Sequence, residues 1–203
     1  MEYLRRILAF EWLSADGYFA DSDGSLSWVV PDDEEAKAAT TGLPAADTVL
    51  FGRRTHELFE GFWPKALQDS ATAPDPHRPG QRSREHRAIA AWMHEATKLV
   101  FSRTLKDVSW NNAHLVRELD PDEISAMKRE PGKNMMIFGS GSIVSQLTRH
   151  RLIDEYQFVV CPAFLGDGRR LLVELAKNMS LELLEAKKYS SGDVSLRSAP
   201  RAD

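Results

Sequence analysis

Short apolar runs alternate along the chain with longer segments in which apolar residues recur at helical spacing. Runs of this length that are bounded by turn-forming residues are typical of strands covered on both faces, as in a largely parallel sheet. The pattern therefore predicts five buried strands. They cover residues 6–13, 48–52, 98–102, 135–139 and 156–162.

Helical patterns fill the segments between these strands. Residues 32–43 have acids in the first turn and a glycine near the end, and 120–132 open with Asp120 as a candidate N-cap before Pro121. Pro64 is expected to end the second helix, because proline has no N–H to continue the hydrogen-bond ladder. The predicted helices cover residues 32–43, 53–63, 83–96, 120–132 and 142–152.

This alternation predicts an α/β sandwich with helices on both faces of the sheet. The end of the chain differs, since residues 180–200 read as two strands about a Ser-Gly-Asp turn, which predicts an antiparallel hairpin at the sheet edge. Residues 64–82 hold four prolines and no apolar periodicity. They are interpreted as a surface loop, either a tolerated insertion or a lid beside a pocket.

Composition describes an ordinary globular protein, with 42% hydrophobic and 28% charged residues among 203. A single domain over residues 1–203 accommodates this length. The net charge of −4 argues against a surface for nucleic acid or an anionic membrane. The single cysteine, Cys161, fits a reducing cytoplasm, and no apolar run approaches the ~20 residues that span a bilayer.

Three predicted strands end in small, hydroxylic or arginine residues. Because ligands of open α/β sheets bind beyond the carboxyl ends of the strands, these three ends are expected to line one crevice. Guanidinium groups and the free N–H groups of helix N-termini suit a ligand with more than one phosphate, so a dinucleotide is expected. The three segments are Phe51-Gly52-Arg53-Arg54-Thr55, Phe101-Ser102-Arg103-Thr104 and Phe138-Gly139-Ser140-Gly141-Ser142.

A Rossmann domain is the first alternative. The segment GSGSIV offers G-x-G-x-x-V, with valine where the third glycine of the fingerprint should stand. The fingerprint opens the first βα unit of that fold, whereas this segment lies two-thirds along the chain. The Rossmann fold is therefore rejected.

The motifs instead resemble those of the dihydrofolate reductase-like superfamily. GRRTHE follows one strand, SRT follows the next, and a glycine pair opens a late helix. Ser14-Ala15-Asp16-Gly17-Tyr18 and the segment 143–172 resemble the reductase domain of riboflavin biosynthesis, the C-terminal domain of the deaminase–reductase RibD. The resemblance implies a three-layer α/β/α sandwich with a mostly parallel, mixed sheet and the C-terminal antiparallel hairpin.

The resemblance also implies NADPH as the cofactor. Gly52, Arg53 and Thr55 fall on the family's phosphate-holding G-R-x-T, and Ser102, Arg103 and Thr104 fall where the 2′-phosphate and ribose are bound. Ser140 replaces the usual second glycine of the pyrophosphate turn. Since serine tolerates a positive φ poorly, either the turn differs or the hydroxyl contacts phosphate. The turn comprises Gly139, Ser140, Gly141, Ser142 and Ile143.

The proton donor has two candidates. Trp28, Pro31 and Asp33 keep the spacing of the dihydrofolate reductase loop that carries the active-site acid, although Asp33 also suits a helix N-terminus. Asp16 is the rival, because the family's S-x-D-G turn borders the nicotinamide pocket. By the same resemblance, Tyr18 and Trp28 are expected to face the substrate.

By resemblance, the chain is expected to be a stand-alone, homodimeric NADPH-dependent reductase. The implied reaction is hydride transfer to a small heterocyclic substrate, of the 5-amino-6-(5-phosphoribosylamino)uracil reductase type. One alternative is a dihydrofolate or pterin reductase, and another is an NADPH-binding protein without catalysis. The single cysteine gives no His/Cys zinc spacing, so no metal is expected.

Overall fold

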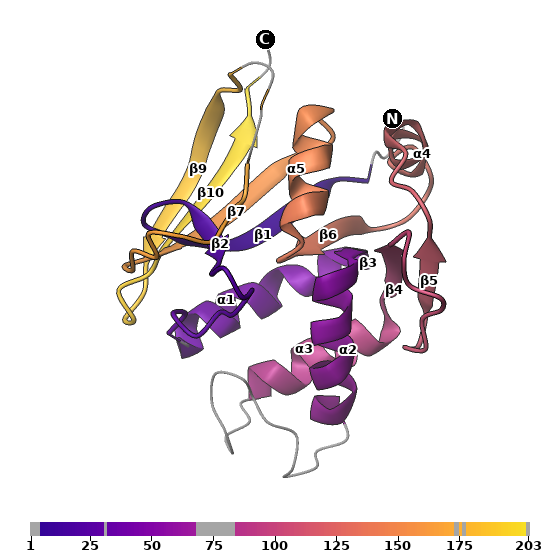
Figure 1. Cartoon of the computed structure of the whole chain (residues 1–203), viewed down its shortest axis with the longest axis horizontal. Coiled ribbons are helices and arrows are strands. Elements are labelled where there is room, and N and C mark those ends of the chain that lie inside the picture. The colour runs from indigo at the N-terminus through magenta and orange to yellow at the C-terminus, as the bar shows by residue number, and fades with distance from the viewer. Residues whose placement is uncertain (1–4, 31, 68–83, 173–174, 176–177, 202–203) are drawn as a thin grey trace.

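The computed structural model describes residues 5–30, 32–67, 84–172, 175 and 178–201. Its main sheet has eight strands in the order β5-β4-β3-β6-β1-β7-β10-β9, shown in Figure 1. The strands of this sheet are β1 (Ile7–Ser14), β3 (Ala46–Gly52), β4 (Thr97–Phe101), β5 (Ala113–Val116), β6 (Asn134–Phe138), β7 (Glu155–Cys161), β9 (Leu181–Lys188) and β10 (Val194–Pro200). A second, two-stranded sheet pairs β2 (Tyr18–Ala20) with β8 (Arg169–Arg170).

All pairs among β1 and β3–β7 in the main sheet are parallel, whereas β10 pairs antiparallel with both β7 and β9. The sheet is therefore mostly parallel with a C-terminal antiparallel hairpin, as predicted. The hairpin turns at the expected Ser-Gly-Asp, where Gly192 has a φ of +96° that favours glycine.

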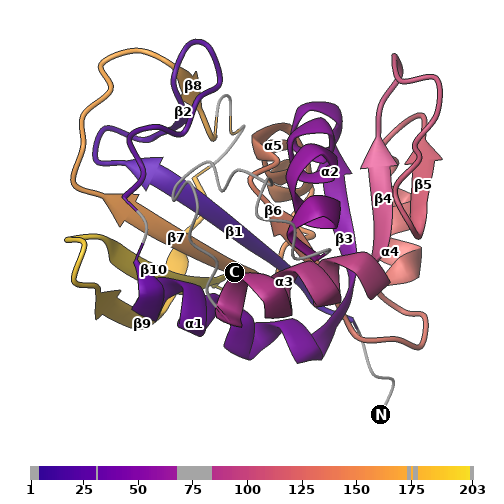
Figure 2. The same ribbon diagram turned by 90° about the horizontal axis from the view of Figure 1, so that it is seen from below.

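Helices cover both faces of the main sheet. Apolar residues of α4 and α5 pack with Ile7, Leu50 and Ile137 on one face, and those of α2 and α3 pack with Val49 and Phe51 on the other. Seen from below, α1 and α3 cross in front of the sheet (Figure 2). The helices are α1 (Asp33–Gly42), the 3₁₀ turn η1 (Leu43–Ala45), α2 (Arg53–Leu67), α3 (Arg84–Glu95), α4 (Pro121–Met127) and α5 (Gly141–Arg149).

The prediction that α2 ends before Pro64 is wrong, because the helix continues to Leu67. Proline in the last turn of a helix removes one hydrogen bond, which the apolar contacts of Phe59 and Trp63 with the core offset. The rest of the expected loop, residues 68–82, lies outside the described residues. Helix α4 ends five residues earlier than the predicted limit of 132.

The parallel pairing brings several strand ends to the same edge of the sheet. Gly52 lies opposite Phe101 across β3 and β4, and Phe10 lies opposite Phe138 across β1 and β6. The segments that follow these strands therefore meet in space. Among the described residues, no helix has the length and apolar character needed to cross a membrane.

Candidate functional site: a cleft at the carboxyl edge of the sheet

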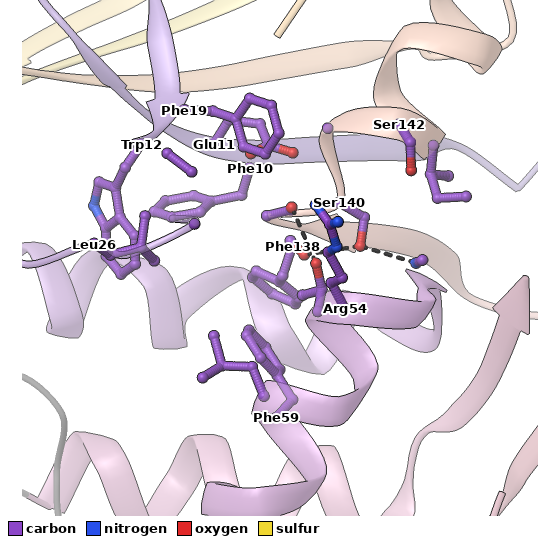
Figure 3. A pocket seen from close by; sticks show the side chains of 18 of the residues that line it. Phe10, Glu11, Trp12, Phe19, Leu26, Arg54, Phe59, Phe138, Ser140 and Ser142 are labelled. Atoms are coloured by element: carbon purple, nitrogen blue, oxygen red, sulfur yellow. Dashed lines mark hydrogen bonds between the residues drawn. The ribbon is translucent and has the colours of Figure 1, made fainter. Parts of the chain in front are cut away.

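A cleft of about 1370 Å³ opens where β1, β3, β4 and β6 end. Figure 3 shows its wall, with side chains from β1, α2, β6 and the start of α5 facing one another. The three segments that the sequence predicts to converge do meet here. The predicted cofactor residues that line the cleft are Gly52, Arg53, Thr55, Ser102, Arg103, Gly139, Ser140, Gly141, Ser142 and Ile143.

The turn between β6 and α5 resolves the question raised by Ser140. Its φ is −91°, and the left-handed conformation falls on Gly139 instead, at +59°. The buried Ser140 hydroxyl accepts a hydrogen bond from the Gly52 N–H at 3.1 Å and donates to the Phe138 carbonyl at 3.4 Å. This hydroxyl therefore ties the start of α5 to the start of α2.

Gly52 allows the two helix N-termini to approach closely, and Gly141 allows the Phe19 ring to pack against the start of α5. A Cβ at Gly52 would lie 3.2 Å from the Ser142 hydroxyl, and a Cβ at Gly141 would lie 2.6 Å from the Phe19 ring. The Thr55 hydroxyl completes the link by donating to the Gly139 carbonyl at 3.3 Å. Two positive dipole ends thus face one cleft, which is an arrangement that attracts anions.

The charges at the start of α2 fit this interpretation. The first turn of α2 carries Arg53 and Arg54 and no acid, so its cations oppose the helix dipole unless an anion lies between them. Arg53 is 3.5 Å from Glu57, and Arg103 is 3.0 Å from Glu118 on the other side of the cleft. Surface pairs of this kind are weak, so both guanidinium groups are available to a ligand.

The loop after β4 is held by its own side chains. The Ser102 hydroxyl accepts hydrogen bonds from the N–H groups of Thr104 and Leu105 at 3.2 and 3.0 Å. Arg117 donates to the Ser102 and Leu105 carbonyls from the neighbouring strand end. Thr104 is not part of the described lining of the cleft, so among the residues of this loop Ser102 and Arg103 face the cleft.

The cleft also holds a buried acid, Glu35, from the first turn of α1. Its side chain accepts a hydrogen bond from the Trp12 indole N–H at 2.6 Å, and the residue is 5% exposed. Burial raises the pKa of Glu35 to about 7, and the nearby negative charges of Asp193 and Asp32 raise it further against the effect of the indole. Glu35 therefore exchanges a proton near neutral pH.

The neighbouring acids have other surroundings. Asp32 is the N-cap of α1 and also accepts from the Ser190 hydroxyl and the Ser191 N–H, which lowers its pKa to about 2. Asp33, the predicted proton donor, is the first residue of α1, is exposed, and lines the cleft. Pro31 of the predicted spacing lies outside the described residues.

Three other predicted residues lie outside the described lining of the cleft. Asp16 accepts hydrogen bonds from the Ser14 hydroxyl and from the N–H groups of Leu165 and Gly166, which hold its pKa at about 2. The Tyr18 ring lies beneath the Arg170 guanidinium, and the Trp28 indole donates to the Ser25 carbonyl. The structure thus gives all three a role in loop packing.

A sequence model of the RibD C-terminal domain matches residues 5–195. The chain belongs to the RibD C-terminal domain family.

Individual proteins resemble the chain over nearly its whole length. The uncharacterized protein YyaP of Bacillus subtilis (strain 168) is 26% identical over 192 residues, which is 95% of this chain and 93% of YyaP. A Shewanella sp. PV-4 protein named for riboflavin biosynthesis has a TM-score of 0.70 at 21% identity, covering 97% of this chain and 99% of that one.

Two further structures share the fold. The Thermotoga maritima deaminase/5-amino-6-(5-phosphoribosylamino)uracil reductase has a TM-score of 0.63 at 14% identity, covering 98% of this chain and 57% of that one. Dihydrofolate reductase from Enterococcus faecalis, complexed with NADP(H), has a TM-score of 0.59 at 12% identity over the whole of both chains. The dihydrofolate reductase-like fold expected from the motifs is confirmed.

Sequence reasoning missed the two acids of the cleft whose pKa is raised by burial, Glu11 and Glu35. Glu11 is a charged residue inside an apolar run, and this interruption was a usable signal that a strand position faces something polar. Glu35 lies in a run of four acids, and only the orientation of α1 singles it out. The described residues contain no group of three or more metal-ligating side chains.

The residues present fit a phosphorylated dinucleotide. The cleft exceeds the roughly 300–1,000 Å³ of drug-sized ligand sites, which leaves room for a second small molecule. The glycine-rich helix starts suit phosphates, as do Arg53, Arg54 and Arg103. The apolar wall of Phe10, Phe19 and Phe138 suits flat rings.

Proposed function

We propose that this protein is an NADPH-dependent reductase that reduces a C=N or C=O bond of a small heterocycle. The observation that carries the proposal is the convergence of two helix N-termini, the flanking arginines and the buried acid Glu35 on a single cleft. Membership of the RibD C-terminal domain family supports a reductase of the riboflavin-pathway type.

The phosphates are assigned to the start of the two helices. In this proposal the N–H groups of α2 and α5 and the Arg53 guanidinium hold the pyrophosphate, while Thr55 and Ser140 fix the spacing of the two helices. Ser102 and Arg103 hold the adenosine ribose and its 2′-phosphate. An arginine at that end favours a 2′-phosphate over a bare hydroxyl.

The proton is assigned to Glu35. Bound NADPH supplies the hydride, and the atom next to the reduced carbon then needs a proton. Glu35 is buried in the cleft wall, and with its pKa at about 7 it is substantially protonated at neutral pH. Asp33 is the second candidate, because it also lines the cleft.

Parallel titrations of intrinsic tryptophan fluorescence with NADPH and NADH test the cofactor assignment. We expect the protein to prefer NADPH, and Arg103→Ala to reduce the preference by about tenfold or more, since it removes a charge-assisted contact. Arg129→Ala is the matched control, because Arg129 is an exposed arginine just beyond the end of α4 and its guanidinium donates to the Ser125 hydroxyl, outside the described lining of the cleft. Equal affinity for the two nucleotides would contradict the proposal.

Loss of NADPH absorbance separates the candidate activities. Oxidation with the phosphoribosylaminouracil substrate, or with a related aminopyrimidine, supports the riboflavin-type reductase. Oxidation with a dihydropterin instead would assign the protein to the dihydrofolate or pterin reductases. Tight NADPH binding without turnover of either substrate would identify a binding protein.

A further inference from the structure

Glu11 occupies an unusual position for a charged residue. It lies on β1, between β6 and β7 in the main sheet, and is 1% exposed. It also lines the cleft. In Figure 3 its carboxyl group lies beside the ring of Phe19.

One oxygen of the Glu11 carboxyl group, the buried Oε1, lacks a hydrogen-bond partner within the described residues of the protein. Burial raises the pKa of Glu11 well above its ordinary value, which favours the neutral acid. Buried polar atoms in native proteins are nearly always paired, so an unpaired one at a ligand cleft indicates a partner that arrives with the ligand.

We propose that Glu11 is a ligand-binding residue that recognises an N–H donor beside a C=O acceptor, as in a primary carboxamide or a ring lactam. A neutral carboxylic acid offers one O–H donor and one carbonyl acceptor, so it pairs with such a group through two hydrogen bonds. The inference rests on the proposed function, from which the class of ligand is taken. It assigns recognition to Glu11 and leaves proton transfer to Glu35, whose side chain is already oriented by Trp12.

The complementary group has two possible sources. The carboxamide of the nicotinamide ring carries it, and so does the lactam edge of a uracil-like substrate. Both molecules belong to the proposed reaction, and the cleft has room for both. The experiment therefore needs one arm for each source.

The test compares two substitutions at the same position. Glu11→Gln keeps a donor and an acceptor in the same shape, whereas Glu11→Leu removes both and leaves an apolar side chain that a buried strand accommodates. Glu155→Gln is the matched control, since Glu155 is another buried glutamate but pairs with Arg6 and Arg197 at the opposite end of the strands. Affinities are measured by calorimetry for NADPH, for 2′-phospho-ADP-ribose and for 5,6-diaminouracil.

Two results would support the proposal. If Glu11 binds the cofactor carboxamide, Glu11→Leu lowers the affinity for NADPH by about tenfold or more and leaves the affinity for 2′-phospho-ADP-ribose unchanged. If Glu11 binds the substrate lactam, Glu11→Leu lowers the affinity for 5,6-diaminouracil to a similar degree and leaves the affinity for NADPH unchanged. In both cases Glu11→Gln stays within about threefold of the wild type.

Three results would overturn it. Glu11→Leu binds both ligands like the wild type, or Glu11→Gln loses as much affinity as Glu11→Leu, or the Glu155→Gln control loses as much as either. Failure of the proposed function is recognised separately, because the wild-type protein would then bind NADPH no better than NADH. In that case only the affinity for 5,6-diaminouracil tests the role of Glu11. If the wild-type protein does not bind 5,6-diaminouracil either, the inference about Glu11 is rejected as well.

Discussion

At the scale of single residues, Glu35 carries the chemistry of the proposal. Its carboxyl is a proton donor only while it is protonated, and its pKa is about 7. The wild-type rate of hydride transfer is therefore expected to be level below pH 7 and to fall as the pH rises through 7. Glu35→Gln should lower kcat/KM by about 10²-fold or more and remove this pH dependence. Stopped-flow NADPH oxidation across pH 5–9 measures both, and an unchanged profile in Glu35→Gln would assign the proton to another group.

The same residue makes a prediction about stability. The pKa of Glu35 is raised from 4.5 to about 7 in the folded protein, so the proton that it binds stabilises the fold below pH 4.5 and this contribution is lost as the pH rises through 7. Glu35→Gln keeps an acceptor for the Trp12 indole and never ionises. Between pH 5 and pH 8 the unfolding midpoint of the variant should therefore rise relative to the wild type. Parallel urea titrations at the two pH values measure this difference.

Site residues that belong to sequence motifs could be predicted from the sequence, whereas residues whose role depends on burial could not. Arg53, Arg103 and the glycines follow strand ends in recognisable patterns, and they do line the cleft. The properties of Glu11 and Glu35 depend on what surrounds them in the folded chain. Their pKa values rise because strands and helices remote in sequence exclude water from them.

At the scale of elements, the contact between α2 and α5 depends on Ser140. Ser140→Ala would leave the Gly52 N–H without its hydrogen bond, and unpaired buried groups cost about 1–3 kcal/mol. We expect a loss of about 1–2 kcal/mol in the free energy of unfolding together with weaker NADPH binding. Ser142→Ala is the control for stability, because Ser142 is exposed. Denaturant titration measures the difference, and equal stability of the two variants would contradict the assigned role.

A second contact joins α1 to the turn between β9 and β10. Asp32 caps α1 and accepts from Ser190 and Ser191, and its pKa falls from 3.8 to about 2. An acid with a lowered pKa stabilises the fold above its ordinary value, and this contribution is lost as the pH falls from about 4 to 2. Asp32→Asn should therefore be less stable than the wild type at pH 7, with a smaller difference near pH 2. Thermal unfolding at the two pH values checks this expectation.

The predicted strands agree with the observed ones because they are continuous apolar runs. Three strands gave no such signal: β2 has three residues, β5 is short and partly exposed, and β8 consists of two arginines. The pairing of β5 with β4 and of β8 with β2 depends on contacts that local sequence does not encode. The predicted end of α2 before Pro64 was wrong for the opposite reason. Proline is a strong local signal for a helix end, but the packing of the surrounding apolar side chains overrode it.

At the scale of the whole molecule, the resemblance to reductase domains predicts a homodimer. The edge strand β9 supports this expectation, because Leu183 is 57% and Leu184 is 43% exposed there. Exposed apolar residues on a long edge strand favour pairing with a second copy. Leu183→Lys is expected to shift the protein from dimer to monomer in analytical ultracentrifugation. A monomeric wild type would contradict the prediction.

The sequence predicted that three segments meet but not the order in which the strands do so. Placing β6 between β3 and β1 brings the start of α5 beside the start of α2, and this neighbourhood creates the site. Neither apolar runs nor turn residues specify which parallel strands are neighbours. The strand-end residues predicted a dinucleotide and the family resemblance predicted NADPH, while the topology shows how separate segments reach one cleft.

A crystal structure of the protein with NADP⁺ tests the central claim most directly. We expect the pyrophosphate within hydrogen-bond distance of the N–H groups that begin α2 and α5, with the 2′-phosphate beside Arg103. Binding of the nucleotide outside the cleft, or in the cleft with its phosphates turned away from both helix N-termini, would contradict the account.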